Sequence, residues 1–306
     1  MYKKSGLMSI KVITPLRAGG ENNISIIDSP IQREGHTGYP KIEASTLKGC
    51  VRNAFEKNSK KVIKEETINA IFGCEKSNQI TASSVAFSDA RILFFPVRSV
   101  KGVFAYITCP YVLQRFSNDI IMTSNQITLP SFSDLKTDKC LIPKGKSKIS
   151  FSAKTVNNDI VVLDEFAFDA CESQDLADYI ENVIKLLHIE VDIEKFINQV
   201  VVIPDDNFTD FVINATEIIT RIKIKNETGV VEEGALFNEE YIPSESILYS
   251  LVFVSDEHKV GPAMSSSDIV KAMEDSMPEY IQIGANMTLG KGFTQCKMNL
   301  DGDVYE

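Results

Sequence analysis

A loop rich in proline and glycine carries the side chains of this sequence that are best suited to chemistry. Residues 28–40 read Asp-Ser-Pro-Ile-Gln-Arg-Glu-Gly-His-Thr-Gly-Tyr-Pro, and their prolines and glycines exclude regular structure. Asp28 opens this loop and His36 lies in its middle. A carboxylate can bind a divalent metal or orient a hydroxyl, and a histidine can protonate a leaving group near neutral pH.

A basic helix is predicted directly after this loop. Ser45 or Thr46 is suited to cap it, and apolar residues recur at helical spacing over 47–55. The same spacing places Ser45, Lys48 and Arg52 on the opposite face, near the helix start. Backbone N–H groups, the helix dipole and two cations would meet there, which favours an anionic phosphate. An acid beside such a helix predicts phosphodiester chemistry, although solvated charges and turn-forming aspartates are the commoner roles of these residues.

A second glycine-rich segment, residues 284–292, reads Gly-Ala-Asn-Met-Thr-Leu-Gly-Lys-Gly. It is not a P-loop, because five residues separate Gly284 from Gly290 and because Gly292 stands where the magnesium-binding Ser or Thr is required. Its glycines permit close backbone approach. Together with Lys291 they predict backbone N–H groups presented to a phosphate. A tight turn between two strands is the alternative interpretation.

Composition indicates an ordinary soluble globular chain of 306 residues, 43% hydrophobic and 24% charged. No apolar run reaches the roughly 18–20 residues that span a bilayer. The N-terminus lacks the apolar region of a signal peptide, so we expect a cytoplasmic protein. The six cysteines are scattered without a close pair, which argues against a zinc site and predicts buried free thiols.

Charge is unevenly distributed along the chain, whose formal net charge is −10. Residues 1–64 hold 12 Lys/Arg against 5 Asp/Glu, whereas residues 156–210 hold 14 acids and 2 bases. The basic part would attract a polyanion, and the acidic part would repel it or dock on the basic part of a neighbour. We therefore expect an assembly subunit rather than a free-standing nucleic-acid binder.

The elements that must position these residues are predicted from hydrophobic periodicity and turn residues. We expect helices from residue 45 and over 65–72, 175–188 and 265–277, and strands over 7–14, 24–27, 79–95, 103–108, 217–225, 247–254, 280–283 and 293–300. Residues 148–168 read as two strands around a turn at 157–159, and 230–237 as a hairpin arm returning on 217–225. This order predicts an α+β fold of the ferredoxin-like type with long insertions.

These segments in this order resemble the RAMP superfamily of CRISPR proteins. The resemblance rests on an N-terminal strand and glycine loop, Asp-x-Pro-Ile-Gln-Arg-Glu-x-His-Thr-Gly from Asp28, Ser-x-x-Lys-Gly-x-x-Arg from Ser45, and Gly-x-x-x-Thr-x-Gly-x-Gly from Gly284. Phe95–Ser99 and Gly234–Phe237 narrow it to the backbone subunits of the type III-B (Cmr) effector complex, over nearly the whole chain. One departure is Arg17, where the family often has histidine.

The resemblance implies a single RAMP domain over residues 1–306, with a modified RRM-like palm, finger and web insertions at about 96–147 and a thumb hairpin at about 225–243. It implies that copies of the chain stack along a CRISPR guide RNA (crRNA) together with the other Cmr subunits and away from membranes. Each copy would cut the complementary target RNA once, at regular intervals, as a metal-dependent endoribonuclease.

Residue roles implied by the resemblance centre on Asp28, which would carry the catalysis with Mg²⁺ or Mn²⁺, with His36 as the nearest acid for the leaving group. The RNA-binding residues would be Arg17, Ser45, Lys48, Gly49, Arg52, Gly290, Lys291 and Gly292. Two alternatives stay open. One is a non-catalytic guide-binding scaffold. The other is a nuclease that processes the guide precursor, against which Arg17 argues because such enzymes usually favour a histidine near the first loop.

Overall fold

The structure is a computed structural model that describes residues 1–20, 27–58, 63–76, 79–132, 135–152, 159–225, 227–259, 261 and 263–304. Most of the predicted strand at 24–27 and of the predicted turn at 157–159 lies outside these residues.

The described chain forms both helices and strands. The helices are α1 (Ala44–Glu56), α2 (Glu65–Phe72), α3 (Pro110–Ile121), α4 (Gln174–Leu186), α5 (Ile193–Ile197), α6 (Asp205–Asn214) and α7 (Ser266–Ser276), with a 3₁₀ turn at Met287–Leu289. The strands are β1 (Lys4–Val12), β2 (Lys41–Ile42), β3 (Cys74–Lys76), β4 (Gln79–Thr81), β5 (Val85–Phe87), β6 (Ala90–Arg98), β7 (Phe104–Thr108), β8 (Lys139–Pro143), β9 (Phe151–Ser152), β10 (Asp159–Leu163), β11 (Phe166–Ser173), β12 (Val200–Val202), β13 (Glu217–Ile224), β14 (Val231–Tyr241), β15 (Ile247–Val254), β16 (Tyr280–Gln282) and β17 (Phe293–Asp303).

The palm has the predicted ferredoxin-like arrangement. Its strands lie in the order β17-β1-β15-β6, and each neighbouring pair is antiparallel. α1 follows β1 and packs on β5 and β16, whereas α7 follows β15 and packs on β1, β15 and β17. The Asn58 side chain, just after α1, donates to the carbonyl oxygen of Ser276 at the end of α7 (3.0 Å), so both helices cover the same face. The prediction of this fold class is confirmed.

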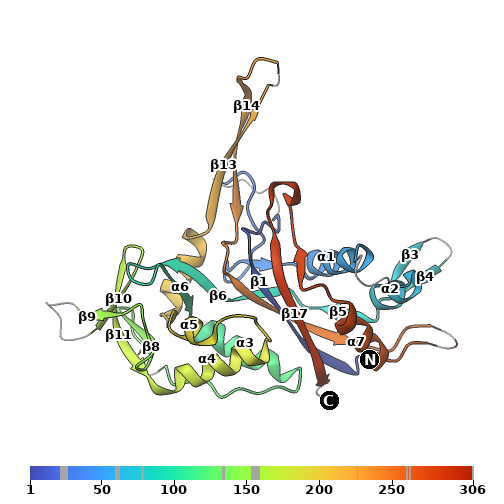
Figure 1. Ribbon diagram of the computed structural model, residues 1–306, viewed down its shortest axis with the longest axis horizontal. Coiled ribbons are helices and arrows are strands. Elements are labelled where there is room, and N and C mark those ends of the chain that lie inside the picture. Colours follow the sequence, from blue (N-terminus) through green and yellow to red (C-terminus); the bar gives the residue numbers. More distant parts are fainter. Residues whose placement is uncertain are drawn as a thin grey trace.

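A second lobe continues the same sheet from β6 through β7, β12, β8, β11, β10 and β9 (Figure 1). It is built from the chain between β6 and β13, and helices α3–α6 belong to it. The predicted insertion at 96–147 covers only part of this lobe. The sequence reading missed α3, which Pro110 begins and which buries Val112, Phe116 and Ile120.

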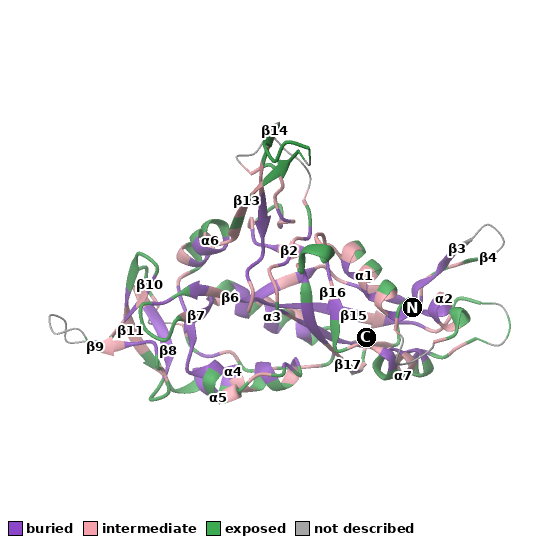
Figure 2. Ribbon diagram, turned by 45° about the horizontal axis from the view of Figure 1, so that its top comes forward, coloured by how far each residue is buried: buried purple, intermediate pink, exposed green. Residues whose placement is uncertain are grey.

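The hairpin of β13 and β14 projects away from both lobes (Figure 1), and most of its tip is exposed (Figure 2). Its strands hydrogen-bond as a ladder only with each other among the described strands, with Arg221 opposite Phe237 and Ile222 opposite Leu236. The hairpin begins at Glu217, earlier than the predicted thumb boundary at 225. It therefore includes the whole of the basic strand predicted at 217–225.

Burial follows the predicted pattern of an apolar core. Phe94, Phe95, Phe116 and Tyr249 are almost fully buried, and all six cysteines are free, four of them buried and Cys50 and Cys171 half-buried. None of the helices in the described part of the chain is long and apolar enough to cross a membrane.

Candidate functional site

Asp28 lies exposed at the foot of the projecting hairpin. The chain around it runs beside β14 and is held there by backbone hydrogen bonds. Ser29 N–H donates to the Asn238 carbonyl oxygen (3.0 Å), and Glu240 N–H donates to the Ser29 carbonyl oxygen (3.0 Å). The Asp28 carboxylate itself accepts a hydrogen bond from the Asn238 N–H (2.8 Å). The loop therefore presents Asp28 at a fixed place on the hairpin.

Arg17 reaches the same place from the first loop of the chain. Its Nη1 lies 3.3 Å from Oε1 of Glu239, a buried residue of β14. Arg221 from β13 pairs with the same carboxylate, and Asn286 donates to both of its oxygens (3.1 and 3.2 Å). Arg17 thus forms an ion pair within the protein, and its role in RNA binding stays a prediction. Glu239 joins three segments that are far apart in the sequence.

Hydrogen bonding keeps Glu239 ionised. Burial raises the pKa of this carboxyl group, but hydrogen bonds from Asn286, Tyr241 and Arg221, with the Arg221 charge, outweigh it and hold the pKa below its ordinary value. A buried carboxylate with this many donors is satisfied rather than poised to accept a proton. Sequence reasoning missed Glu239. The only local signal is a pair of acids, Glu239 and Glu240, at the end of an alternating strand.

The glycine-rich loop is a close-packed turn rather than an open cradle. A Cβ on Gly292 would lie 2.1 Å from the Ile283 carbonyl oxygen, and a Cβ on Gly284 would lie 2.2 Å from that of Arg17. The N–H groups of Gly290, Lys291 and Gly292 all donate to carbonyl oxygens, those of Met287, Asn286 and Pro15.

The prediction that these N–H groups face a phosphate is therefore wrong, and what the loop offers is the side chain of Lys291. Its ammonium lies 4.9 Å from the centre of the Tyr241 ring, at the foot of the hairpin. The glycine-rich loop and the Asp28 loop thus approach the hairpin foot from different parts of the sequence.

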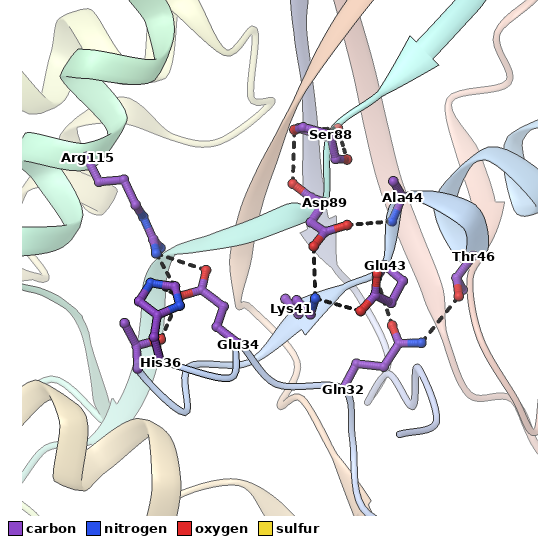
Figure 3. A network of polar contacts seen from close by, with 12 residues as sticks. Gln32, Glu34, His36, Lys41, Glu43, Ala44, Thr46, Ser88, Asp89 and Arg115 are labelled. Atoms are coloured by element: carbon purple, nitrogen blue, oxygen red, sulfur yellow. Dashed lines mark hydrogen bonds and ion pairs between the residues drawn. The ribbon is translucent and has the colours of Figure 1, made fainter. Parts of the chain in front are cut away.

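The start of α1 already holds a carboxylate. The helix begins at Ala44 with Glu43 at the N-cap, so neither Ser45 nor Thr46 caps it. Asp89 accepts from the Ala44 N–H and from Lys41 (2.9 Å each), as Figure 3 shows. Burial raises the pKa of Asp89, but these two hydrogen bonds hold it below its ordinary value. The Ala44 N–H at the helix start is therefore bound by a side chain of the protein and is not open to a phosphate.

The other α1 residues that were predicted to bind RNA differ in whether their side chains are available to contact an anion. Arg52 donates to Glu56, to the Gly73 carbonyl oxygen (2.9 Å each) and to Asn69, so it ties α1 to α2. Lys48 is half-buried, and the described residues offer it no hydrogen-bond or ion-pair partner. Burial and the neighbouring Arg52 charge lower its pKa. Ser45 and Gly49 are exposed. Lys48 is thus the cation of this helix that is available to an anion.

His36 lies further along the loop from Asp28, on the side of α3. Its ring is 72% exposed, and its Nε2 is 4.0 Å from Oε2 of buried Glu34. Arg115 of α3 donates to both oxygens of Glu34 (2.8 Å each), as Figure 3 shows. The described contacts of His36 thus lead to α3 and not to the hairpin foot. The structure does not join His36 to Asp28.

A metal would have to be held at Asp28 by few protein ligands. No group of three or more His, Cys, Asp or Glu side chains with metal-binding geometry occurs among the described residues. Asp28 therefore has no such cluster around it in the described part of the chain. Mg²⁺ needs no such cluster, because it is commonly held by one or two carboxylates with substrate phosphates and waters completing the shell. The exposed Asp28 carboxylate fits this arrangement.

Comparison with known proteins identifies the class to which this fold and loop arrangement belong. The family model of the RAMP superfamily matches residues 9–295, and the chain belongs to this family. It is 37% identical over 300 residues to the CRISPR system Cmr endoribonuclease Cmr4 of Pyrococcus furiosus, covering 95% of each chain.

Solved structures agree with this assignment. The crystal structure of oligomeric Cmr4 from Pyrococcus furiosus matches with a TM-score of 0.74 and 31% identity, covering 100% of each chain. A chain of the type III-B Cmr-beta complex bound to cognate target RNA matches with a TM-score of 0.73 over 97% of this chain. It is 23% identical to this chain and so adds evidence for the fold alone.

Proposed function

We propose that this chain is a backbone subunit of a type III-B CRISPR effector complex, binds the guide RNA, and cleaves complementary target RNA. The observation that carries the proposal is Asp28, an exposed carboxylate fixed at the foot of a projecting hairpin, in a chain 37% identical to a Cmr endoribonuclease over 95% of its length. Guide pairing would supply sequence specificity, so the protein need only hold backbone and shape.

Asp28 would act on the target strand by holding a divalent metal or orienting the attacking 2′-hydroxyl. An aspartate carboxylate is a weak general base at neutral pH, so proton abstraction is the less suitable role. Mg²⁺ or Mn²⁺, when bound, would stabilise charge that develops on the phosphate. The hydrogen bond from Asn238 N–H fixes the direction in which the carboxylate points.

Lys48 and Lys291 would hold RNA backbone. Lys48 lines a groove with Gly73, Thr81 and Ser83 between α1 and the β3–β4 hairpin. Lys291 lies over Tyr241 at the hairpin foot. Both ammonium groups can contact phosphates without reading bases, as a guide of any sequence requires.

The test is target cleavage by a reconstituted complex carrying Asp28→Ala or Asp28→Asn, with Mg²⁺ and with EDTA. We expect both variants to lose the evenly spaced cuts while guide and target binding persist, and we expect EDTA to stop the wild-type complex. Asp178→Ala is the matched control, because Asp178 is an exposed carboxylate of α4 in the other lobe. Unchanged cuts with Asp28→Asn would favour the scaffold alternative and move the catalyst elsewhere.

A guide-processing nuclease is a weaker candidate for this chain. Such an activity would use a histidine in the first loop, where this chain has Arg17 paired with Glu239. Incubating guide precursor with the wild-type complex tests it directly. Processing that survives Asp28→Asn would identify a second active site.

A further inference from the structure

Two adjacent carboxylates at the foot of β14 point to opposite sides of the strand. Glu239 and Glu240 are 5% and 2% exposed, and neighbouring residues of a strand alternate between its faces. Glu239 contacts Arg17 and Asn286, as described above. Glu240 faces the loop that carries Asp28. A buried carboxylate needs hydrogen-bond donors for its oxygens, so the donors to Glu240 show which segments it holds together.

Glu240 takes hydrogen bonds from three donors, two in the loop and one just before the hairpin. The Ile31 N–H donates to Oε2 (3.1 Å), and the Arg33 guanidinium donates through Nη2 to Oε1 (2.5 Å). The Thr216 hydroxyl, just before β13, also donates to Oε1 (2.8 Å). The carboxylate therefore joins the loop backbone, a loop side chain and the start of the hairpin.

Arg33 extends this connection in two further directions. Its Nη1 donates to the Gly38 carbonyl oxygen (2.7 Å) and to the Val212 carbonyl oxygen of α6 (3.1 Å). One guanidinium thus closes the loop on itself and fastens it to α6 and to β14. A lysine cannot make these contacts together, because its ammonium lacks the planar fork of the guanidinium.

The position of Asp28 is coupled to this pair through the loop backbone. Asp28 lies three residues before Ile31, and the Ser29 and Asn238 backbone hydrogen bonds hold the intervening chain beside β14. If Glu240 lost its charge, Arg33 would keep a half-buried positive charge without its carboxylate partner. The loop would then be free to move relative to the hairpin.

We propose that Glu240, acting through Arg33 and the Ile31 amide, is a positioning residue that fixes Asp28 relative to the hairpin and so sets where the target RNA is cut. This inference rests on the proposed function. The contacts at the hairpin foot would set the distance between the hairpin and the scissile phosphate. Glu240 itself touches no reacting atom in this scheme.

The experiment compares Glu240→Gln, Arg33→Lys and wild type in the assembled complex. It measures the single-turnover cleavage rate at saturating target, the cut positions at nucleotide resolution, and hydrogen exchange of the Ile31 amide. We expect Glu240→Gln to lower the rate at least tenfold and spread the cuts over neighbouring phosphates. Guide and target affinities should stay within twofold, and exchange at Ile31 should rise. Glu181→Gln is the control, because it breaks the Glu181–Lys185 pair (2.7 Å) of α4 in the other lobe.

Each outcome decides the inference. Wild-type rate and wild-type cut positions in Glu240→Gln would overturn it, even if exchange at Ile31 rises. If Glu240→Gln fails to assemble, Arg33→Lys, which keeps the charge, gives the same readouts and the same criteria. An Asp28→Asn complex that still cleaves would overturn the proposed function instead. Exchange at Ile31 would then still decide whether Glu240 holds the loop.

Discussion

Lys48 and Arg52 lie one turn apart on α1 and differ in what holds them. Lys48 has no described partner, and its pKa is lowered by burial and by Arg52, so a bound phosphate would relieve an unfavourable environment. We expect Lys48→Met to weaken guide binding and to reduce the slope of log affinity against log salt by about 0.7, the value for one phosphate contact on a single strand. Binding titrations between low and moderate salt measure this slope.

Arg52→Met is the comparison that separates binding from structure. Arg52 donates to Glu56, Gly73 and Asn69, and losing donors to partly buried acceptors costs about 1–3 kcal/mol. We expect that loss in urea unfolding, with a salt slope close to wild type. A salt slope that falls in Arg52→Met as much as in Lys48→Met would contradict this division of roles.

At the residue scale, the sequence is a better guide to which segments carry candidate side chains than to which contacts those side chains make. The composition of residues 28–40 indicated an irregular loop that Asp28 opens, and the structure places Asp28 outside helices and strands, where it is exposed. The partners of the site, Glu239 with Arg17 and Asp89 with Ala44, come from positions far apart in the sequence. Local spacing carries no information on such pairs. That is why an anion site was predicted at a helix start that Asp89 fills.

At the scale of one element, a prediction concerns the glycine-rich loop, residues 284–292. Gly290 and Gly292 both have positive φ, 73° and 75°, but only Gly292 would bring a Cβ against backbone, 2.1 Å from the Ile283 carbonyl oxygen. We expect Gly290→Ala to cost about 1–2 kcal/mol from the left-handed conformation alone. Gly292→Ala should cost more, because the loop must also move away from β16.

Urea unfolding of both variants measures this difference, and guide binding reports its effect on Lys291. We expect Gly292→Ala to weaken binding more than Gly290→Ala, since it displaces the turn that carries the lysine. Equal losses of stability in the two variants would mean that the loop relaxes without cost. The close packing inferred at Gly292 would then be wrong.

The prediction of helices and strands was accurate where a regular hydrophobic pattern extends over many residues. β15 and α2 have the predicted bounds, and α4 and α7 differ by one or two residues at their ends. α5, α6 and β12 were missed because each is short or of mixed polarity, and Val200–Val202 reads as an apolar run of undefined type. Their place is fixed by tertiary pairing, since β12 lies between β7 and β8 in the sheet.

At the scale of the whole molecule, the ferredoxin-like palm was predictable from element order, whereas the continuous sheet was not. The sequence cannot show that β7 leaves the palm to pair in parallel with β12, residues 200–202, after a long excursion. The described part of the acidic segment, residues 159–210, lies in this second lobe, at the opposite end of the molecule from α2 (Figure 1). Its docking on a neighbouring copy remains a prediction.

The hairpin tip is exposed, although it carries apolar side chains at paired positions. Ile222 and Leu236 lie opposite each other and are 51% and 66% exposed, so the folded subunit gains little from them. Apolar side chains that project in this way can wedge between stacked bases, as in proteins that kink duplexes. We expect the double variant Ile222→Ser, Leu236→Ser to change the unfolding free energy by less than about 0.5 kcal/mol. Guide binding should persist, while the regular spacing of target cuts is lost.

Val100→Ser supplies the control for this variant, since Val100 is 69% exposed in the turn that joins the antiparallel strands β6 and β7. Both substitutions remove exposed apolar surface from a hairpin, so a general effect of polarity would appear in each. Sequencing of the cleaved target distinguishes them. Regular cuts from the Ile222, Leu236 variant would mean that the hairpin contributes its backbone and its foot, but not its apolar tip, to the spacing. If that variant alone loses the regular cuts and keeps wild-type stability, the apolar side chains at the tip determine the spacing of the cuts without contributing to the stability of the subunit.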